Sequence, residues 1–154
     1  MIPILLSLRH KKVIIIGGGR VATRKAQRLV TETQVIVIAE EATNELRSLA
    51  SLNRIKLKLK SYETADITEA DLIYICTDNP AVNQQILADV RPNQWLNDTT
   101  QKHNSDFFSM GEIEANEVTI ALTTAGKNPK QTKQIKRQLQ KLFSVAAHSQ
   151  IDKK

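Results

Sequence analysis

The chain has 154 residues, about the length of one domain, and a formal net charge of +6 from 22 Lys and Arg against 16 Asp and Glu. Hydrophobic residues make up 41% and charged residues 25%, as in ordinary globular proteins, and no apolar stretch approaches the roughly 18 residues of a membrane span. We therefore expect a cytoplasmic protein with no membrane span, and the positive charge favours an anionic ligand.

The first two thirds of the chain alternates strand and helix patterns. Apolar, often β-branched runs predict strands at 13–16, 35–38, 54–60 and 94–97, and the run at 70–80 predicts a buried strand that leads into a turn. Helical spacing of apolar residues predicts helices at 20–30, 42–52 and 81–90. This order predicts an α/β fold with a Rossmann-type, doubly wound parallel sheet, in which ligands bind at the carboxyl ends of the strands.

The run RIKLKLK at 54–60 alternates apolar and basic residues, which is typical of a strand with one exposed face. We expect Ile55, Leu57 and Leu59 to face the core. The lysines between them are expected to form a solvated edge rather than a ligand site, because edge lysines also prevent strand-to-strand aggregation.

The pattern changes after Phe108. The sequence then predicts one strand, a loop containing Gly126 and Pro129, and one basic amphipathic helix. This segment is too small to form a core of its own, so we expect it to pair with a second copy of the chain. The expected domains are the Rossmann-type domain at 1–110 and a dimerisation segment at 111–154.

A glycine turn follows the first predicted strand. Gly17, Gly19 and Ala22 fit the pattern G-x-G-x-x-[GA] between a strand and a helix, the context in which this motif indicates dinucleotide binding. The glycines let the backbone approach a pyrophosphate, and the free N–H groups at the start of the helix attract its negative charge.

Two acids, Glu40 and Glu41, follow the second predicted strand. A carboxylate there accepts hydrogen bonds from ribose hydroxyls and repels a 2′-phosphate, so NAD is favoured over NADP. The sequence does not decide which acid contacts the ribose, because strand length places Ala39 at the usual acidic position. The alternative is that both acids simply open the next helix and stabilise its dipole.

Cys76 lies in the apolar run DLIYICTD, where a buried structural thiol is expected. The three histidines are scattered without metal-ligand spacing, so no metal site is expected. Aromatic residues are only 4% of the chain, which leaves nucleic-acid binding a minor alternative.

Several motifs together resemble the precorrin-2 dehydrogenase family, the NAD-dependent N-terminal part of siroheme synthases. In chain order they are IPILLSLRHKKVIIIGGGRVATRKAQRL, CTDNPAVNQQI, DFFSM and VTIALTTAGKNPKQTKQIK. The resemblance implies a homodimer that transfers a hydride from precorrin-2 to NAD and forms sirohydrochlorin, in siroheme or cobalamin biosynthesis.

The resemblance also implies positions for the cofactor and the substrate. Together with the glycine motif, the expected cofactor residues are Gly17, Gly19, Arg20, Val21, Glu40, Glu41, Thr77 and Asp78. The polycarboxylate substrate is expected at the TTAGKNPK loop, through Thr123, Thr124 and Lys127. The alternative for this loop is a polar turn that only caps the following helix.

The sequence departs from the family in two respects. Thr100 stands where the family usually has an aspartate, and threonine is no general base at neutral pH, so a proton-accepting role passes to Asp98 or His103. Of these, His103 is expected to be an exposed loop residue, which leaves Asp98 as the catalytic candidate. The family's C-terminal helical domain is also expected to be largely absent.

These departures favour a dehydrogenase that does not insert metal. The alternatives are a bifunctional dehydrogenase and ferrochelatase, and a non-catalytic NAD-binding dimer.

Overall fold

The computed structural model describes residues 1–115, 118–124 and 127–151. The chain divides into two compact units, Met1–Phe107 and Phe108–Lys154, each with its own internal packing. The expected loop residue Gly126, and Asn116 within the expected dimerisation segment, lie outside the described residues.

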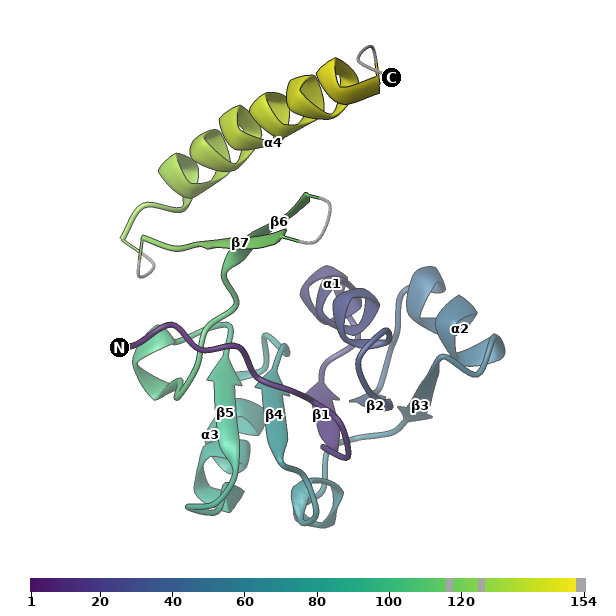
Figure 1. The fold of residues 1–154 in the computed structure, drawn as a ribbon. Helices are drawn as coiled ribbons and strands as arrows, with labels where there is room; N and C mark the ends of the chain where they lie inside the picture. The colour runs from purple at the N-terminus through teal and green to yellow at the C-terminus, as the bar shows by residue number, and fades with distance from the viewer. Residues whose placement is uncertain (116–117, 125–126, 152–154) are drawn as a thin grey trace. The chain divides into compact units, whose positions relative to one another are not determined.

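The first unit is built on a five-stranded parallel sheet with the order β3-β2-β1-β4-β5 (Figure 1). Its strands are β1 Val13–Ile16, β2 Val35–Ala39, β3 Ile55–Leu59, β4 Leu72–Ile75 and β5 Trp95–Asp98. Its helices are α1 Arg20–Leu29, α2 Asn44–Ser51 and α3 Pro80–Asp89, with short 3₁₀ turns η1 Thr64–Ile67 and η2 Lys102–Asn104. The predicted doubly wound sheet is confirmed, and its strand order reverses between β1 and β4.

Alternate residues of the central strands supply the two cores of this unit. Val13 and Ile15 face a cluster that includes Ala22 and Ala26 of α1, together with Leu46 of α2. The other residues of β1 join a second cluster with η1 and with Ile86 of α3. Because β1 is covered on both faces, all four of its residues are buried, and a continuous apolar run is what the sequence shows there.

The prediction for β3 is wrong at its last residue. Ile55 is buried and Leu57 packs against the first cluster, but Leu59 is 49% exposed and belongs to neither cluster. Leu59 ends the edge strand of the sheet, where one side has no neighbouring strand.

The second unit contains a hairpin and a long helix. Strands β6 Gly111–Ala115 and β7 Val118–Leu122 are antiparallel, with Ile113 opposite Ile120, and α4 spans Pro129–Ile151. The predicted strand corresponds to β7, whereas β6 is not predicted from the sequence. In β6 the acids Glu112 and Glu114 flank a single apolar residue, Ile113, which is 3% exposed, so the alternation is too short to recognise.

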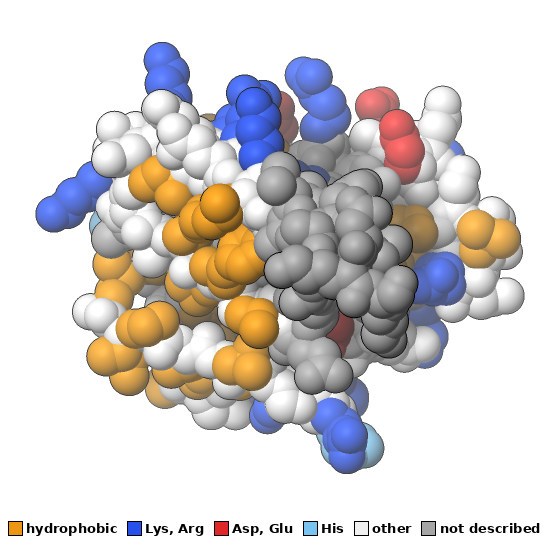
Figure 2. Space-filling model, turned by 45° about the horizontal axis from the view of Figure 1, so that its top comes forward, with side chains coloured by type: hydrophobic (Ala, Val, Ile, Leu, Met, Phe, Trp, Pro, Cys, Tyr) orange, Lys and Arg blue, Asp and Glu red, His pale blue; other side chains and the backbone are white. Residues whose placement is uncertain are grey.

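None of the helices in the described part of the chain is long and apolar enough to cross a membrane. Hydrophobic side chains nevertheless reach the surface (Figure 2). In the first unit the most exposed hydrophobic side chains are at the amino terminus, where Met1, Ile2 and Leu5 are each more than 80% exposed.

Candidate functional site

A cleft of about 780 Å³ opens at the carboxyl ends of four strands in the first unit. Its lining comes mainly from residues 17–21 after β1, 39–43 at the end of β2, 60–62 after β3 and 76–79 after β4. This is the edge at which the strand order reverses, the position where open α/β sheets bind their ligands. The volume lies within the range of small-molecule and cofactor sites.

Two of the three glycines in the turn after β1 are required by the protein's own packing. Gly17 has a φ of +118°, and a Cβ atom there would lie 2.5 Å from the carbonyl oxygen of Cys76. At Gly18 a Cβ atom would lie 1.8 Å from the carbonyl oxygen of Glu41. The sequence motif specifies a glycine at position 17 but allows any residue at position 18. Glycine is needed at 18 because the tertiary fold brings the Glu41 backbone against it.

Gly19 differs from both. A Cβ atom there would meet nothing within 4 Å, and its φ of −82° and ψ of −171° suit any residue. Gly19 is also the N-cap of α1, which has no side-chain cap and no acid in its first turn. Open space before uncapped helix N–H groups is the arrangement that admits an anion such as a pyrophosphate.

The turn is held in place by two threonines. Thr23 Oγ1 donates to the Gly19 carbonyl at 3.0 Å, and the hydroxyls of Thr23 and Thr43 are hydrogen-bonded at 2.8 Å. The backbone N–H of Thr43 donates to the Gly18 carbonyl at 3.0 Å. Thr43 is the N-cap of α2, so the starts of α1 and α2 position the turn together.

The acidic end of β2 also lies in the cleft. Ala39 is the last residue of β2 and is buried, so Glu40 and Glu41 are the first residues beyond the strand, and both are exposed. Ser61 Oγ donates to Glu40 Oε1 at 2.6 Å, which orients the Glu40 carboxylate.

A lysine for which the sequence predicts a solvated edge follows the end of β3. Lys60 lines the cleft, and its backbone N–H donates to the Ala39 carbonyl at 3.0 Å. Lys60 Nζ is 2.9 Å from an oxygen of Asp66 and 3.0 Å from one of Glu63. Because β2 and β3 pair in parallel, Lys60 follows β3 at the same edge of the sheet at which Glu40 and Glu41 follow β2. Chain order alone does not reveal this proximity.

The end of β4 turns directly into α3. Thr77 Oγ1 accepts from the Asn79 N–H at 3.1 Å, and Asn79 Oδ1 caps α3 by accepting from the Ala81 N–H at 3.0 Å. Asn83 of α3 donates to the Thr77 carbonyl at 3.1 Å. These bonds fix Thr77 and the exposed Asp78 at the mouth of the cleft.

Cys76 and Lys25 lie close to this strand end. Burial raises the pKa of the Cys76 thiol to about 11, although the Lys25 ammonium opposes the shift. Burial lowers the pKa of Lys25 to about 8, and its Nζ donates to Asn97 Oδ1 at 3.1 Å and lies 4.9 Å from the centre of the Tyr74 ring. Because its pKa is raised, the thiol of the partly buried Cys76 is protonated and weakly reactive at neutral pH.

Asp98, the expected proton acceptor, ends β5 and is opposite Ile75 of β4. It is 4% exposed and does not belong to the residues that line the cleft. One oxygen accepts from the N–H and hydroxyl of Thr100 and from the N–H of Gln101, and the other accepts from Asn104 at 2.8 Å. Burial alone would raise the pKa of Asp98, but these hydrogen bonds outweigh it and hold that pKa below its ordinary value.

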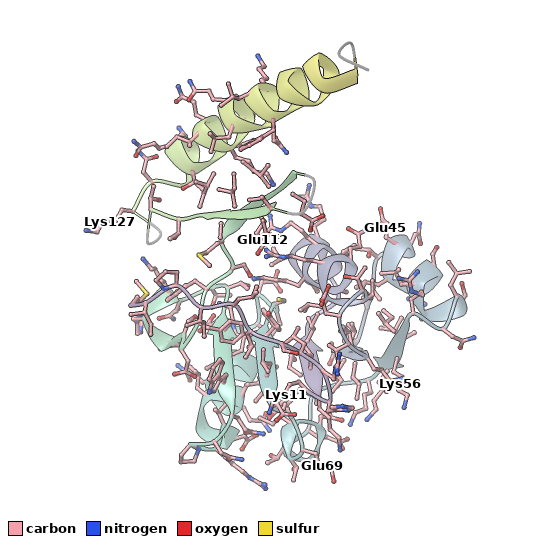
Figure 3. All side chains as sticks on the ribbon, in the orientation of Figure 1. Lys11, Glu45, Lys56, Glu69, Glu112 and Lys127 are labelled. Atoms are coloured by element: carbon pink, nitrogen blue, oxygen red, sulfur yellow. The ribbon has the colours of Figure 1, made fainter. Side chains whose placement is uncertain are left out.

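The expected substrate loop belongs to the second unit. Thr124 Oγ1 accepts from the Asn128 N–H at 3.0 Å, and Asn128 Oδ1 accepts from the Gln131 N–H at 3.0 Å in the first turn of α4. Lys127 is exposed and projects from the loop (Figure 3), and Thr123 is also exposed. The polar turn does cap the helix, and it leaves Lys127 on the surface.

All eight residues expected to bind the cofactor line the one cleft, whereas the others lie elsewhere: Asp98 at the end of β5, and Thr123, Thr124 and Lys127 in the second unit. The individual roles of these residues remain predictions. Among the residues described, no three His, Cys, Asp or Glu side chains gather where they could hold a metal ion.

Comparison with known proteins identifies the family. Residues 4–110 match a family described as "Putative NAD(P)-binding". The chain is 30% identical over 144 residues to the precorrin-2 dehydrogenase of Bacillus subtilis (strain 168), covering 93% of this chain and 89% of that protein. It is 27% identical to the siroheme synthase of Actinobacillus pleuropneumoniae serotype 7 (strain AP76), but it spans only 30% of that protein's length.

A solved structure titled SirC, precorrin-2 dehydrogenase, has the same fold, with a TM-score of 0.86 over 97% of this chain and 76% of that one. Sequence identity to it is 23%. The cleft, the glycine turn and the match over nearly the full length of the Bacillus subtilis protein agree with one another, and the chain belongs to the precorrin-2 dehydrogenase family.

Proposed function

We propose that this protein is an NAD-dependent dehydrogenase that oxidises precorrin-2 to sirohydrochlorin. The observation that carries the proposal is Gly19. Packing within the described part of the chain gives no reason for a glycine there, since a Cβ atom would meet nothing within 4 Å, and a ligand against the backbone supplies one.

The residues around the cleft fit a nicotinamide dinucleotide. We place the pyrophosphate at Gly19 and at the N–H groups of Arg20 and Val21, which open α1. Glu40 is the better candidate for the ribose hydroxyls, because Ser61 orients its carboxylate. The nicotinamide then lies toward Thr77 and Asp78 at the end of β4.

The cofactor, when bound, supplies the hydride acceptor. The task of the chain is to hold the donor carbon of the substrate against it, and positioning of this kind accounts for a large part of many enzymes' rate. Asp98 remains the candidate proton acceptor. Its lowered pKa keeps it ionised at neutral pH but makes it a weak base, so we propose that positioning contributes more than proton abstraction.

We propose that the carboxylates of the substrate are bound by Thr123, Thr124 and Lys127. The exposed Lys127 supports this assignment, and the acid-free first turn of α4 adds a site that favours negative charge. We further propose that the second unit pairs with its counterpart in another copy of the chain, which would give a homodimer.

Metal insertion needs a group that strips protons from pyrrole nitrogens. Thr100 is unsuited to this, and the Asp98 carboxylate is engaged by donors from Thr100, Gln101 and Asn104. We therefore propose that the protein releases sirohydrochlorin without metal.

Cofactor choice is tested by equilibrium titration with NAD and NADP. The wild type should bind NAD more tightly, and Glu40→Gln should weaken NAD binding while Glu41→Gln, the matched control, leaves it nearly unchanged. Tighter binding of NADP by the wild type would overturn the NAD assignment. Equal losses in the two variants would overturn the choice of Glu40.

A further inference from the structure

We infer that Glu63 and Asp66 are specificity-determining residues, which favour NAD by holding the ammonium group of Lys60 away from the ribose end of the cleft. The inference rests on the proposed function, in which Glu40 marks the ribose end. It assigns a role to residues that do not themselves line the cleft.

Lys60 stands where a 2′-phosphate would be recognised. The Lys60 backbone N–H donates a hydrogen bond to the carbonyl of Ala39, the residue before Glu40. The next residue, Ser61, donates to the Glu40 carboxylate. Lysine binds phosphate readily as a point charge, and a basic side chain near the end of β2 is the usual feature of NADP sites. Left to itself, Lys60 would oppose the preference that Glu40 and Glu41 create.

The side chain of Lys60 is instead committed to η1. Its Nζ lies 2.9 Å from Asp66 and 3.0 Å from Glu63, and hydrogen bonds to Asp66 and then to Glu63 raise the pKa of Lys60, so it stays charged. Asp66 is a rigid partner: its side chain is 4% exposed, and it accepts from the Glu63 N–H at 3.0 Å in the capping box of η1.

The charges around this corner balance. Lys58 Nζ lies 3.6 Å from Asp66, so two lysines face two acids and the cluster has no net charge. With this cluster neutral, Glu40 and Glu41 are left to repel a 2′-phosphate at the end of β2. Neutralising both Glu63 and Asp66 would leave the two lysines uncompensated and would release Lys60 toward the cleft.

The test compares dissociation constants for NADP and NAD in the full-length protein. Glu63→Gln combined with Asp66→Asn should lower the ratio of the NADP constant to the NAD constant by about five- to tenfold, as expected for one or two new charge pairs near the surface. The Asp66→Asn change keeps a side-chain oxygen for the Glu63 N–H, and the Glu63 side chain is 69% exposed, so these changes spare the fold. Adding Lys60→Gln to the pair should restore the wild-type ratio.

A matched control removes a charge elsewhere. Glu69 forms an ion pair with Lys12, next to the start of β1, and lies near Lys11 in Figure 3. Glu69→Gln should leave the ratio unchanged. The inference is overturned if the ratio in the Glu63 and Asp66 variant stays within twofold of wild type, if Glu69→Gln shifts it equally, or if the gain survives Lys60→Gln. A wild type that binds neither dinucleotide overturns the proposed function itself, and this inference with it.

Discussion

The three consecutive glycines offer a direct test because two of them are required by the protein's own packing and the third is not. Replacing Gly19 with Val puts a side chain into the open space before α1, where the protein has no atom within 4 Å of the new Cβ. The free energy of unfolding without ligand should change by less than about 1 kcal/mol, since loss of a good N-cap residue is partly offset by a stiffer unfolded chain. Dinucleotide binding should weaken at least about 100-fold.

Gly18→Ala is the contrasting variant. Its Cβ would lie 1.8 Å from the Glu41 carbonyl oxygen, so the backbone must shift. The free energy of unfolding should therefore fall by at least about 2 kcal/mol. Gly17→Ala adds an unfavourable positive φ to a similar clash and should cost at least as much. The same turn therefore contains two positions that control folding and one that controls binding.

Thermal unfolding with and without NAD measures both quantities. At a concentration 100 times the dissociation constant, NAD should stabilise the wild type by about 2.7 kcal/mol, or about 10 °C for a unit of this size. Gly19→Val should unfold near the wild-type temperature but gain less than about 0.5 kcal/mol from the same NAD. The reasoning fails if Gly19→Val binds NAD within a few-fold of wild type, or if it is destabilised as much as Gly18→Ala.

Three further predictions concern other parts of the molecule. When sirohydrochlorin is mixed with ferrous or cobaltous ion, the macrocycle's absorption should change no faster with the protein than without it. Faster metal insertion with the protein would contradict the dehydrogenase-only proposal. If that faster insertion disappeared in Asp98→Asn, Asp98 would be the carboxylate responsible. The pKa of Lys25 is lowered to about 8 in the folded protein, so above that pH the unfolded chain binds more protons than the folded chain does. The contribution of Lys25 to the free energy of unfolding therefore rises between about pH 8 and 10. Urea titrations should show Lys25→Met more stable than wild type near pH 7 with a gap that narrows across this range, and a constant gap would refute the assignment. Light scattering at micromolar concentration should give the mass of a dimer. Val118 is 57% exposed in the second unit, and Val118→Glu should weaken this dimer. A monomeric wild type would refute the pairing of the second units.

The parts of the fold that the sequence predicts well are those set by local pattern. The β-branched run of β1 ends at a glycine, and its predicted bounds, 13–16, are the observed ones. The carboxyl ends of parallel strands meet at one edge of a sheet, so residues as distant in sequence as Gly19 and Asp78 could be expected to share a cleft. Chain order and strand direction were sufficient for that step.

What the sequence did not reveal depends on contacts between distant segments. The need for glycine at 18 comes from the carbonyl of Glu41, and the role of Thr43 comes from the meeting of two helix starts. The alternating pattern of β3 predicts an exposed edge for Lys60, whereas the acids three and six residues later in the chain fold back to bind it. The hydrogen bonds around Asp98 likewise depend on the turn at 100–104.

The central claim is tested most directly by anaerobic turnover of precorrin-2 with NAD. The account predicts that sirohydrochlorin and reduced nicotinamide appear in equal amounts, more slowly with NADP, and not above background with Gly19→Val. Failure to form sirohydrochlorin above the uncatalysed rate, by a protein that demonstrably binds NAD, would contradict the account and would make the chain a non-catalytic member of its family.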